Sequence, residues 1–239
     1  MPPFLSASWE NLALVNYAVS PEILLPYVPK GTELDTWNDV YYVSLVGFMF
    51  TNVRLLGVPI PFHTDFEEVN LRFYVRRKDG NAWKRGVVFI KEIVPKTMIS
   101  LVANTLYKEH YVTLEMKHEY TTNPDGNRSW KYQWKYQNQW NKLSVITENQ
   151  SVPIIKGSES EFISEHFWGY TKVSETETTE YEVKHPTWNI YPVLSSQIDC
   201  NLAGLYGQPF QEMLENPPLS VFLAQGSAIE VMGKKKISS

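Results

Sequence analysis

Residues 66–75 alternate between apolar and polar side chains, and this pattern predicts a β-strand whose two faces differ in chemistry. The apolar face carries Val69, Leu71, Phe73 and Val75, and the polar face carries Glu68, Asn70 and Arg72. Residues 86–90, which follow a turn, are apolar on both faces and are predicted to pair with this strand. We therefore expect the polar face to line a partly enclosed pocket.

The register of this predicted hairpin has two alternatives. A two-residue turn at Asp79-Gly80 places Lys91 opposite Glu68, whereas a three-residue loop places Ile90 there. Because a one-residue slip moves a side chain to the other face, the alternatives differ in whether a lysine amine enters the pocket.

A second hairpin is predicted around residues 123–126, where Asn-Pro-Asp-Gly favours a three-residue loop with Gly126 in a left-handed bulge. Its register pairs aromatic and apolar residues on one face and opposite charges on the other. The predicted pairs are Tyr120–Trp130, His118–Tyr132, Met116–Trp134, Leu114–Tyr136, Glu119–Lys131 and Glu115–Lys135. We expect the aromatic run 130–136 to pack in the core, and not to form a stacking platform for sugars or single-stranded nucleic acid.

The remaining patterns predict mostly strands, with short helices inserted singly. Residues 41–55 are apolar on both sides and predict a strand that is covered on both faces. Residues 171–184 predict exposed β-structure, and helices are predicted near residues 20–25, 95–107, 159–167 and 209–214. Because no linker, repeat or low-complexity tract interrupts the chain, we expect one β-rich α+β domain over residues 1–239.

The charge balance, 22 basic against 26 acidic residues with a net charge of −4, disfavours a nucleic-acid-binding face. No apolar stretch approaches the roughly 20 residues that a membrane-spanning helix needs. The N-terminal sequence lacks the basic and apolar regions of a signal peptide, and Cys200 is the single cysteine. These features predict a soluble, cytoplasmic protein without nucleic-acid or membrane partners.

Metal and nucleotide cofactors are not predicted. The five histidines lack the spacing of zinc or iron ligands, and no glycine-rich phosphate loop or Gly-x-Ser-x-Gly nucleophile motif occurs. The candidate chemistry therefore lies on the strand at 66–75. Arg72 suits a carboxylate or another anion, the Asn70 amide lines the same pocket, and a semi-buried Glu68 can have the raised pKa of a general acid or base.

Several separated motifs also share a pattern with a known family. They are Trp9 with Tyr17, Val28-Pro29-x-Gly31, the Glu68-x-Asn70-x-Arg72 strand, the segments 86–89 and 205–207, and Pro218-x-Ser220-Val221-Phe222. This set resembles the YqjF-like family of uncharacterised proteins, which is related in fold to acetoacetate decarboxylase. The motifs extend from about residue 9 to residue 231, and the Glu-x-Asn-x-Arg strand is the most specific of them.

The resemblance implies a closed or cone-shaped antiparallel β-barrel with helices packed outside and a cavity inside. In the decarboxylase relatives a lysine forms a Schiff base with a β-keto acid, and Glu68 resembles the glutamate that assists it. The relatives' Pro-Lys dipeptide is missing here, and simple alignment puts Glu109 or Tyr111 where the lysine belongs. Lys108 and, in the two-residue-turn register, Lys91 are the candidates for the amine, so a true acetoacetate decarboxylase is not predicted. The relatives also make a homo-oligomer plausible.

Two functional hypotheses follow. The first is a cofactor-free enzyme acting on a small oxo-acid or carbonyl compound, in which Glu68 is the acid or base, Arg72 holds the substrate anion and Tyr107 or Tyr111 donates a hydrogen bond. The second is a non-catalytic small-molecule-binding barrel, a sensor or sequestering protein, that uses the same pocket. Both hypotheses place a small-molecule ligand, anionic where it meets Arg72, inside the sheet.

Overall fold

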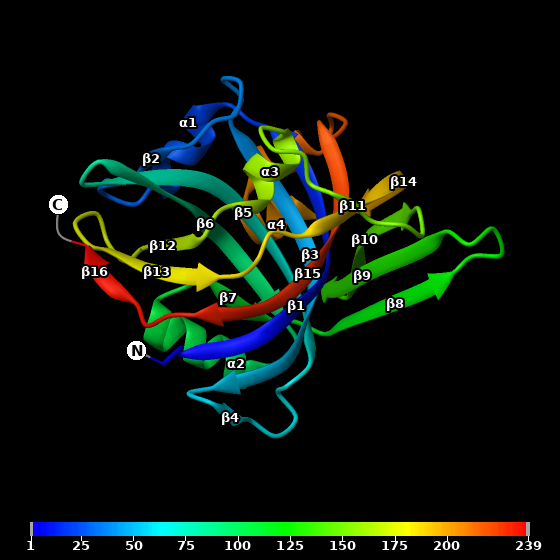
Figure 1. The fold of residues 1–239 in the computed structure, drawn as a ribbon, viewed down its shortest axis with the longest axis horizontal. Coiled ribbons are helices and arrows are strands. Elements are labelled where there is room, and N and C mark those ends of the chain that lie inside the picture. The colour runs from blue at the N-terminus through cyan, green and yellow to red at the C-terminus, as the bar shows by residue number, and fades with distance from the viewer. Residues whose placement is uncertain (1, 238–239) are drawn as a thin grey trace.

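A ring of β-strands forms the centre of the molecule in the computed structural model, which describes residues 2–237 (Figure 1). Neighbouring strands pair in the order β13-β12-β6-β5-β3-β1-β15, and β13 pairs again with β15 to close the ring. These strands are β1 (Leu5–Ala18), β3 (Tyr42–Leu55), β5 (Phe66–Asp79), β6 (Ala82–Val94), β12 (Trp168–Lys172), β13 (Thr178–Lys184) and β15 (Ser220–Val231).

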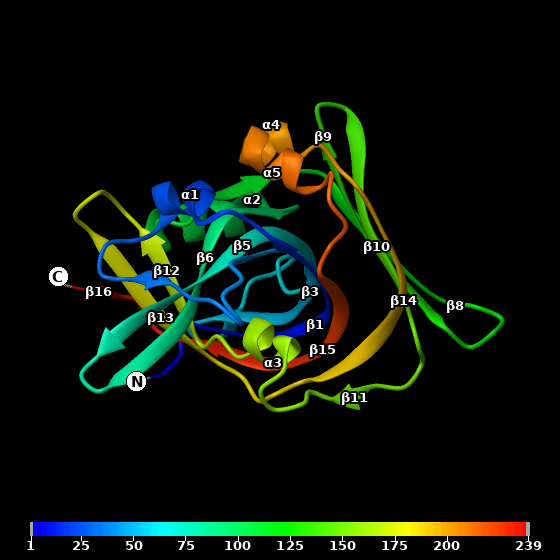
Figure 2. The same ribbon diagram turned by 90° about the horizontal axis from the view of Figure 1, so that it is seen from above.

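The other strands border the ring or extend it. Beyond β15 the sheet continues through β14, β10, β9 and β8, which lie to one side of the ring as an arm (Figure 2). The bounds of these strands are β14 (Asn189–Asp199), β10 (Gln139–Thr147), β9 (Arg128–Tyr136) and β8 (Met116–Thr122). The shorter strands are β2 (Glu33–Leu34), β4 (Val58–Pro59), β7 (Tyr111–Thr113), β11 (Val152–Pro153) and β16 (Lys235–Ile237).

The helices of the described chain are short. They are α1 (Pro21–Leu24) with a 3₁₀ turn (Leu25–Tyr27), α2 (Thr97–Val102) with a π-helical turn (Ala103–Tyr107), α3 (Glu159–Ser164), α4 (Leu202–Tyr206) and α5 (Gln208–Met213). Helices α1, α2, α3 and α5 lie where the sequence predicts helices, whereas α4 was not predicted. Figure 1 places α3 and α2 at opposite ends of the ring, and α3 covers its end because Phe162 packs against Tyr42 and Tyr74, with ring centroids 5.8 and 5.4 Å apart.

The ring wall separates two hydrophobic cores, which explains why β3 is apolar on both sides. Val43 and Leu45 belong to the outer core, which packs against the arm and helices α1, α4 and α5, while Tyr42, Val46 and Phe48 belong to the inner core. β5 divides in the same way, since Val69, Leu71, Phe73 and Val75 face the outer core. The predicted two-sided burial of β3 is confirmed.

The hairpin between β5 and β6 has neither of the two predicted registers. Asp79 pairs with Ala82 across a turn at Gly80 and Asn81, and a bulge at Ile90 shifts the register again between Leu71 and Arg72. Lys91 therefore pairs with Leu71 on the face that packs against the outer core, and Glu92 pairs with Asn70. Both alternatives fail because the glycine turn lies one residue later than expected and the bulge adds one residue to β6.

The hairpin between β8 and β9 has the predicted register. Tyr120 pairs with Trp130, Met116 with Trp134 and Glu119 with Lys131, around a loop in which Gly126 has a φ of +85°. The pairing stops at Met116, so Leu114 and Tyr136 do not extend the ladder. Trp130, Tyr132 and Trp134 are buried, which confirms that this aromatic run packs in the core.

Two details of the expected architecture differ. β12 runs parallel to β6, so the ring is mixed and not purely antiparallel; a parallel pair needs a long crossover, which the segment containing α2, the β8–β10 strands and α3 supplies. Residues 178–181 of the predicted exposed β-structure are buried, because β13 is a member of the ring. Within residues 2–237, no helix is both long and apolar enough to cross a membrane.

Closure of the ring beside β12 predicts a destabilising substitution at Gly86. An added Cβ would overlap the Trp168 carbonyl oxygen and lie 2.6 Å from the Tyr170 ring. Gly86→Ala is expected to lower the free energy of unfolding by about 1–3 kcal/mol, because overpacking forces the two strands apart. Urea denaturation checks this value, with Gly233→Ala as the control because an added Cβ there has no neighbour within 4 Å. Equal stability of the two variants would contradict the close contact of β6 with β12.

Candidate functional site

A cavity of about 180 Å³ lies inside the ring, and its walls are unequal in chemistry. One part of the lining is polar, and we call it the polar end: Glu68, Asn70, Arg72, Glu92, Glu109, Tyr111, Ser164 and His166. All of these residues except the half-buried Tyr111 are buried. Most of the remaining lining is apolar, with many aromatic rings. The polar face of β5 therefore faces an enclosed space, as its sequence pattern predicts.

Glu68 is held by two hydrogen bonds at the polar end. The Asn70 side-chain amide donates to one carboxylate oxygen at 2.9 Å, and the Tyr111 hydroxyl donates to the other at 3.1 Å. Burial raises the pKa of Glu68 from its ordinary value of 4.5 to about 7, and the nearby Glu109 carboxylate adds to the rise, while the hydrogen bonds and the Arg72 charge oppose it. Glu68 can therefore take up or release a proton near neutral pH.

Two further glutamates reach the same space from other strands and loops. Glu109 accepts hydrogen bonds from the Thr171 hydroxyl at 2.7 Å and the Tyr181 hydroxyl at 2.9 Å, and burial raises its pKa to about 7. Burial, followed by the charges of Glu109 and Glu68, raises the pKa of Glu92 well above the ordinary range, and its Oε2 atom has no hydrogen-bond partner in the described protein. The protonated form of Glu92 is therefore favoured in this interior.

Arg72 carries a buried positive charge with little compensation. Its side chain is 8% exposed, one terminal nitrogen donates a 3.4 Å hydrogen bond to the Ile163 carbonyl, and Nε has no partner. No ion pair with a carboxylate is formed by Arg72 in residues 2–237. Because a buried, unpaired guanidinium is costly, this position favours an anion.

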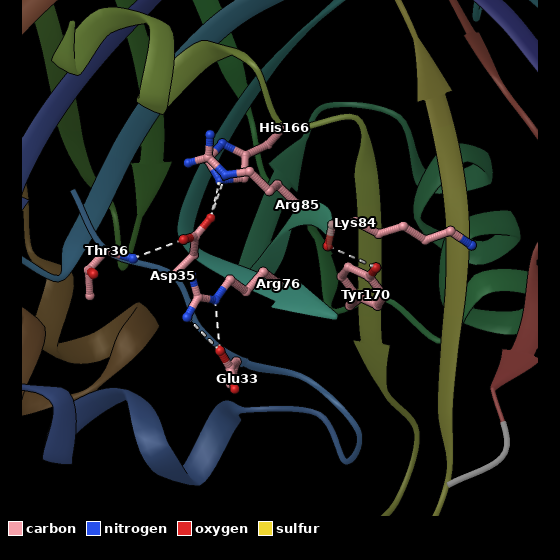
Figure 3. Close-up of polar contacts among 8 residues, drawn as sticks. All are labelled: Glu33, Asp35, Thr36, Arg76, Lys84, Arg85, His166 and Tyr170. Atoms are coloured by element: carbon pink, nitrogen blue, oxygen red, sulfur yellow. Dashed lines mark hydrogen bonds and ion pairs between the residues drawn. The ribbon is translucent and has the colours of Figure 1, made fainter. Parts of the chain in front are cut away.

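An ion network centred on Asp35 meets the polar end at His166 (Figure 3). Asp35 accepts a 2.7 Å hydrogen bond from Arg85 Nε and lies 3.4 Å from His166 Nε2. Burial, reinforced by the charges of Arg85 and Arg72, lowers the pKa of His166 to about 4, although Asp35 opposes this shift. The imidazole is thus neutral at pH 7, and the contact with Asp35 assigns its proton to Nε2, which leaves Nδ1 as a buried acceptor without a partner.

The structure brings five of the seven predicted site residues to the cavity. Glu68, Asn70, Arg72, Tyr107 and Tyr111 line it, although the Tyr107 hydroxyl donates to the Met232 carbonyl oxygen at 3.1 Å.

The two lysines that were candidates for the amine, Lys91 and Lys108, do not line the cavity. Lys91 donates to the Leu205 carbonyl oxygen on the outer side of the wall, and Lys108 is exposed in a left-handed turn with a φ of +62°. Among the described residues that line the cavity there is no lysine. The left-handed turn at Lys108 instead directs Glu109 inward, where it is buried.

Sequence reasoning missed Glu92, Glu109, Tyr181 and His166 as members of the site. Alternation along residues 86–94 offered a signal for Glu92, but the bulge at Ile90 determines which face it occupies. Tyr181 and His166 arrive from segments that no local pattern connects to β5. As for cofactors, the described residues contain no group of three or more His, Cys, Asp or Glu side chains arranged to hold a metal ion.

Comparison with solved structures supports the fold. The enduracididine biosynthesis enzyme MppR complexed with pyruvate matches 100% of this chain and 91% of its own, with a TM-score of 0.70 at 12% identity. Acetoacetate decarboxylase from Legionella pneumophila matches 99% of this chain and 87% of its own, with a TM-score of 0.68 at 12% identity. An acetoacetate decarboxylase-like enzyme from Sphingomonas wittichii gives a TM-score of 0.67 at 10% identity, over 100% of this chain and 95% of its own. At these identities the likeness concerns the fold alone.

Comparison of sequences identifies the family. The uncharacterized protein YqjF of Bacillus subtilis is 34% identical over 113 residues, which are 47% of this chain and 45% of YqjF, so the match spans less than half of that relative. The model of the family DUF2071, described as an uncharacterized conserved protein, matches residues 6–228. A match of this length includes residues of every strand of the ring, and the chain therefore belongs to the DUF2071 family, within an acetoacetate decarboxylase-like fold.

Proposed function

We propose that this protein binds a small oxo acid in the ring cavity and catalyses proton transfer at the carbon next to its carbonyl group, without a cofactor. Arg72 carries the proposal, because it is a buried guanidinium with no carboxylate partner in the described chain. A ligand carboxylate supplies that partner and removes the cost of the unpaired charge. The MppR structure with pyruvate supports this ligand class, since an oxo acid is bound there by a protein with this fold.

The glutamates supply the acid and the base of the proposed reaction. The Glu68 carboxylate takes the proton as the C–H bond breaks, and the electron pair of that bond forms the carbon–carbon double bond of the enol. Glu92, whose protonated form is favoured by burial, donates to the carbonyl oxygen, and Tyr111 keeps Glu68 oriented through its hydroxyl. A base with a pKa near the working pH is the efficient choice for such a transfer, and Glu68 has a pKa of about 7.

Binding without turnover is the second candidate function. The observation that favours it is the lysine-free lining of the cavity in the described chain, because a Schiff-base step has no amine there. In this version the same Arg72 and the same carboxyl groups hold the ligand, and the protein serves as a sensor or a sequestering protein.

Hydrogen exchange in deuterated water distinguishes the two functions. The protein is expected to accelerate the replacement of the C3 protons of 2-oxobutyrate and 2-oxohexanoate by deuterium, followed by proton NMR. Glu68→Gln is expected to lower the rate by about 100-fold or more, the usual share of a general base. Glu67→Gln is the matched control, because this neighbouring side chain points outward and lies 2.6 Å from His118 Nδ1.

Ligand-induced thermal stabilisation of the wild-type protein, without exchange above the buffer rate, would contradict the enzyme and leave the binding function. Equal exchange rates in the wild-type protein and in Glu68→Gln would show that Glu68 is not the base of the reaction.

The raised pKa of Glu68 also predicts how stability depends on pH. The folded state keeps the proton up to a pH of about 7, whereas the unfolded chain loses it near 4.5, so the free energy of unfolding falls as the pH rises through this interval. One such group contributes a slope of about 1.4 kcal/mol per pH unit. Glu68→Gln is expected to reduce the measured slope between pH 5 and pH 7 by up to this amount in urea titrations. Glu119→Gln is the control, because Glu119 forms an exposed ion pair with Lys131, and it should leave the slope unchanged. A reduced slope in Glu119→Gln, or an unchanged slope in Glu68→Gln, would contradict the raised pKa of Glu68.

A further inference from the structure

We infer that the ligand is not a minimal oxo acid but one with an apolar tail, either a chain of several carbons or an aromatic ring. This inference rests on the proposed function for the orientation of the acid group, and it deepens that function by naming the substrate class. Its evidence is the arrangement of the cavity walls, which is separate from the chemistry of Arg72 and Glu68.

The cavity lining has a polar part and an apolar part that differ in exposure. Most residues of the polar end are buried, and Glu68 is only 2% exposed. Another part of the lining is apolar and only partly buried, and Met98 is 49% exposed. We call this part the open end, and it consists of Phe4, Leu5, Leu55, Ile60, Met98, Ile99, Val102 and Ala103. A ligand whose acid group lies against Arg72 therefore directs its remaining atoms toward an apolar exit.

The elements that carry the open end lie together in space. Met98, Ile99 and Val102 are on α2, Leu55 ends β3, and Leu5 begins β1. Figure 1 shows α2, β4 and the N-terminus at the same end of the ring, away from α3. Since α3 covers the opposite end through Phe162, the route between the cavity and solvent passes the apolar side chains of α2.

Aromatic rings form the wall between the two ends. Trp9 lies edge-on to Phe48 and Trp188, with ring centroids 5.7 and 6.2 Å apart, and Phe50 stacks on Phe66 at 5.1 Å. All five residues line the cavity. Rings that pack against one another in this way form a pre-built apolar surface, which favours contact with an apolar tail over contact with water.

The enclosed part of the cavity is about 180 Å³, close to the roughly 150 Å³ of an apolar cavity that accommodates a benzene molecule. Pyruvate has as many non-hydrogen atoms as benzene, so an oxo acid with a tail also occupies the open end. Pyruvate contains a single methyl group beyond its oxo-acid group, so it leaves most of the aromatic wall without a contact. A phenyl ring or a chain of four to six carbons contacts the aromatic wall and extends toward the open end.

Isothermal titration calorimetry with a homologous series of ligands tests the inference. The probes are pyruvate, 2-oxobutyrate, 2-oxohexanoate, 2-oxooctanoate and phenylpyruvate. The dissociation constant is expected to fall by about fourfold for each added methylene until the tail fills the cavity, which is the usual gain for burying one methylene. Phenylpyruvate is expected to bind at least tenfold more tightly than pyruvate.

A substitution at the open end separates tail binding from a general change in the protein. Val102→Phe narrows the exit. It is expected to raise the dissociation constant of 2-oxooctanoate by tenfold or more, while the dissociation constant of pyruvate changes by less than twofold. Leu101→Phe is the matched control, because this neighbour on α2 is 52% exposed and is not part of the lining. It is expected to leave both constants unchanged, and circular dichroism confirms that both variants are folded.

The outcomes distinguish this inference from the proposed function. A dissociation constant that stays the same or rises from pyruvate to 2-oxooctanoate contradicts the inference of an apolar tail. In that case, C3 exchange of short oxo acids that depends on Glu68 still supports the proposed reaction. If affinity depends on the tail but no C3 exchange is observed, the inferred ligand class is supported and the proposed reaction is contradicted. If no member of the series binds at millimolar concentration, both proposals are wrong.

Discussion

Closure of the sheet by the pairing of β13 with β15 is the constraint on which the site depends. In an open sheet, the polar face of β5 would have solvent or a flat layer opposite it. The closed ring instead places Tyr181 and Val183 of β13 across the interior from β5, so that Glu68, Asn70 and Arg72 lie inside a walled space. Because both faces of the wall are then buried, β3 and β5 carry apolar residues outward and a mixture of aromatic and polar residues inward.

Burial in this ring determines the electrostatics of the site. Three glutamates lie in one interior, and burial raises the pKa of each because the charged form loses its hydration there. Raised pKa values favour the neutral carboxyl form and so lower the negative charge that the interior holds. Arg72 has no such way to become neutral, since a guanidinium keeps its charge in proteins. The site therefore combines carboxyl groups, which can be neutral or charged, with one arginine that is always charged.

The sequence predicted those parts of the fold that depend on local patterns. Alternation identified β5 and its two faces, two-sided apolarity identified β3, and the loop at Gly126 fixed the register of β8 with β9. The site could be predicted only where it lies on β5 or in the loop that follows α2. Glu92 and Lys91 exchange faces because of one bulge at Ile90, which reflects packing against the rest of the ring. His166 and Tyr181 join the site through ring closure, which brings together residues about 100 positions apart, and no local pattern records that contact.

We expect the interior of the ring to hold a carboxyl group that titrates near neutral pH, in the same cavity as an arginine without a carboxylate partner. Carbon-13 NMR of protein labelled at the glutamate side-chain carboxyl measures this directly, with the Glu68 signal assigned by its loss in Glu68→Gln. The expected titration midpoint for Glu68 is about 7. A midpoint near 4.5, the ordinary value for a glutamate in water, would contradict it.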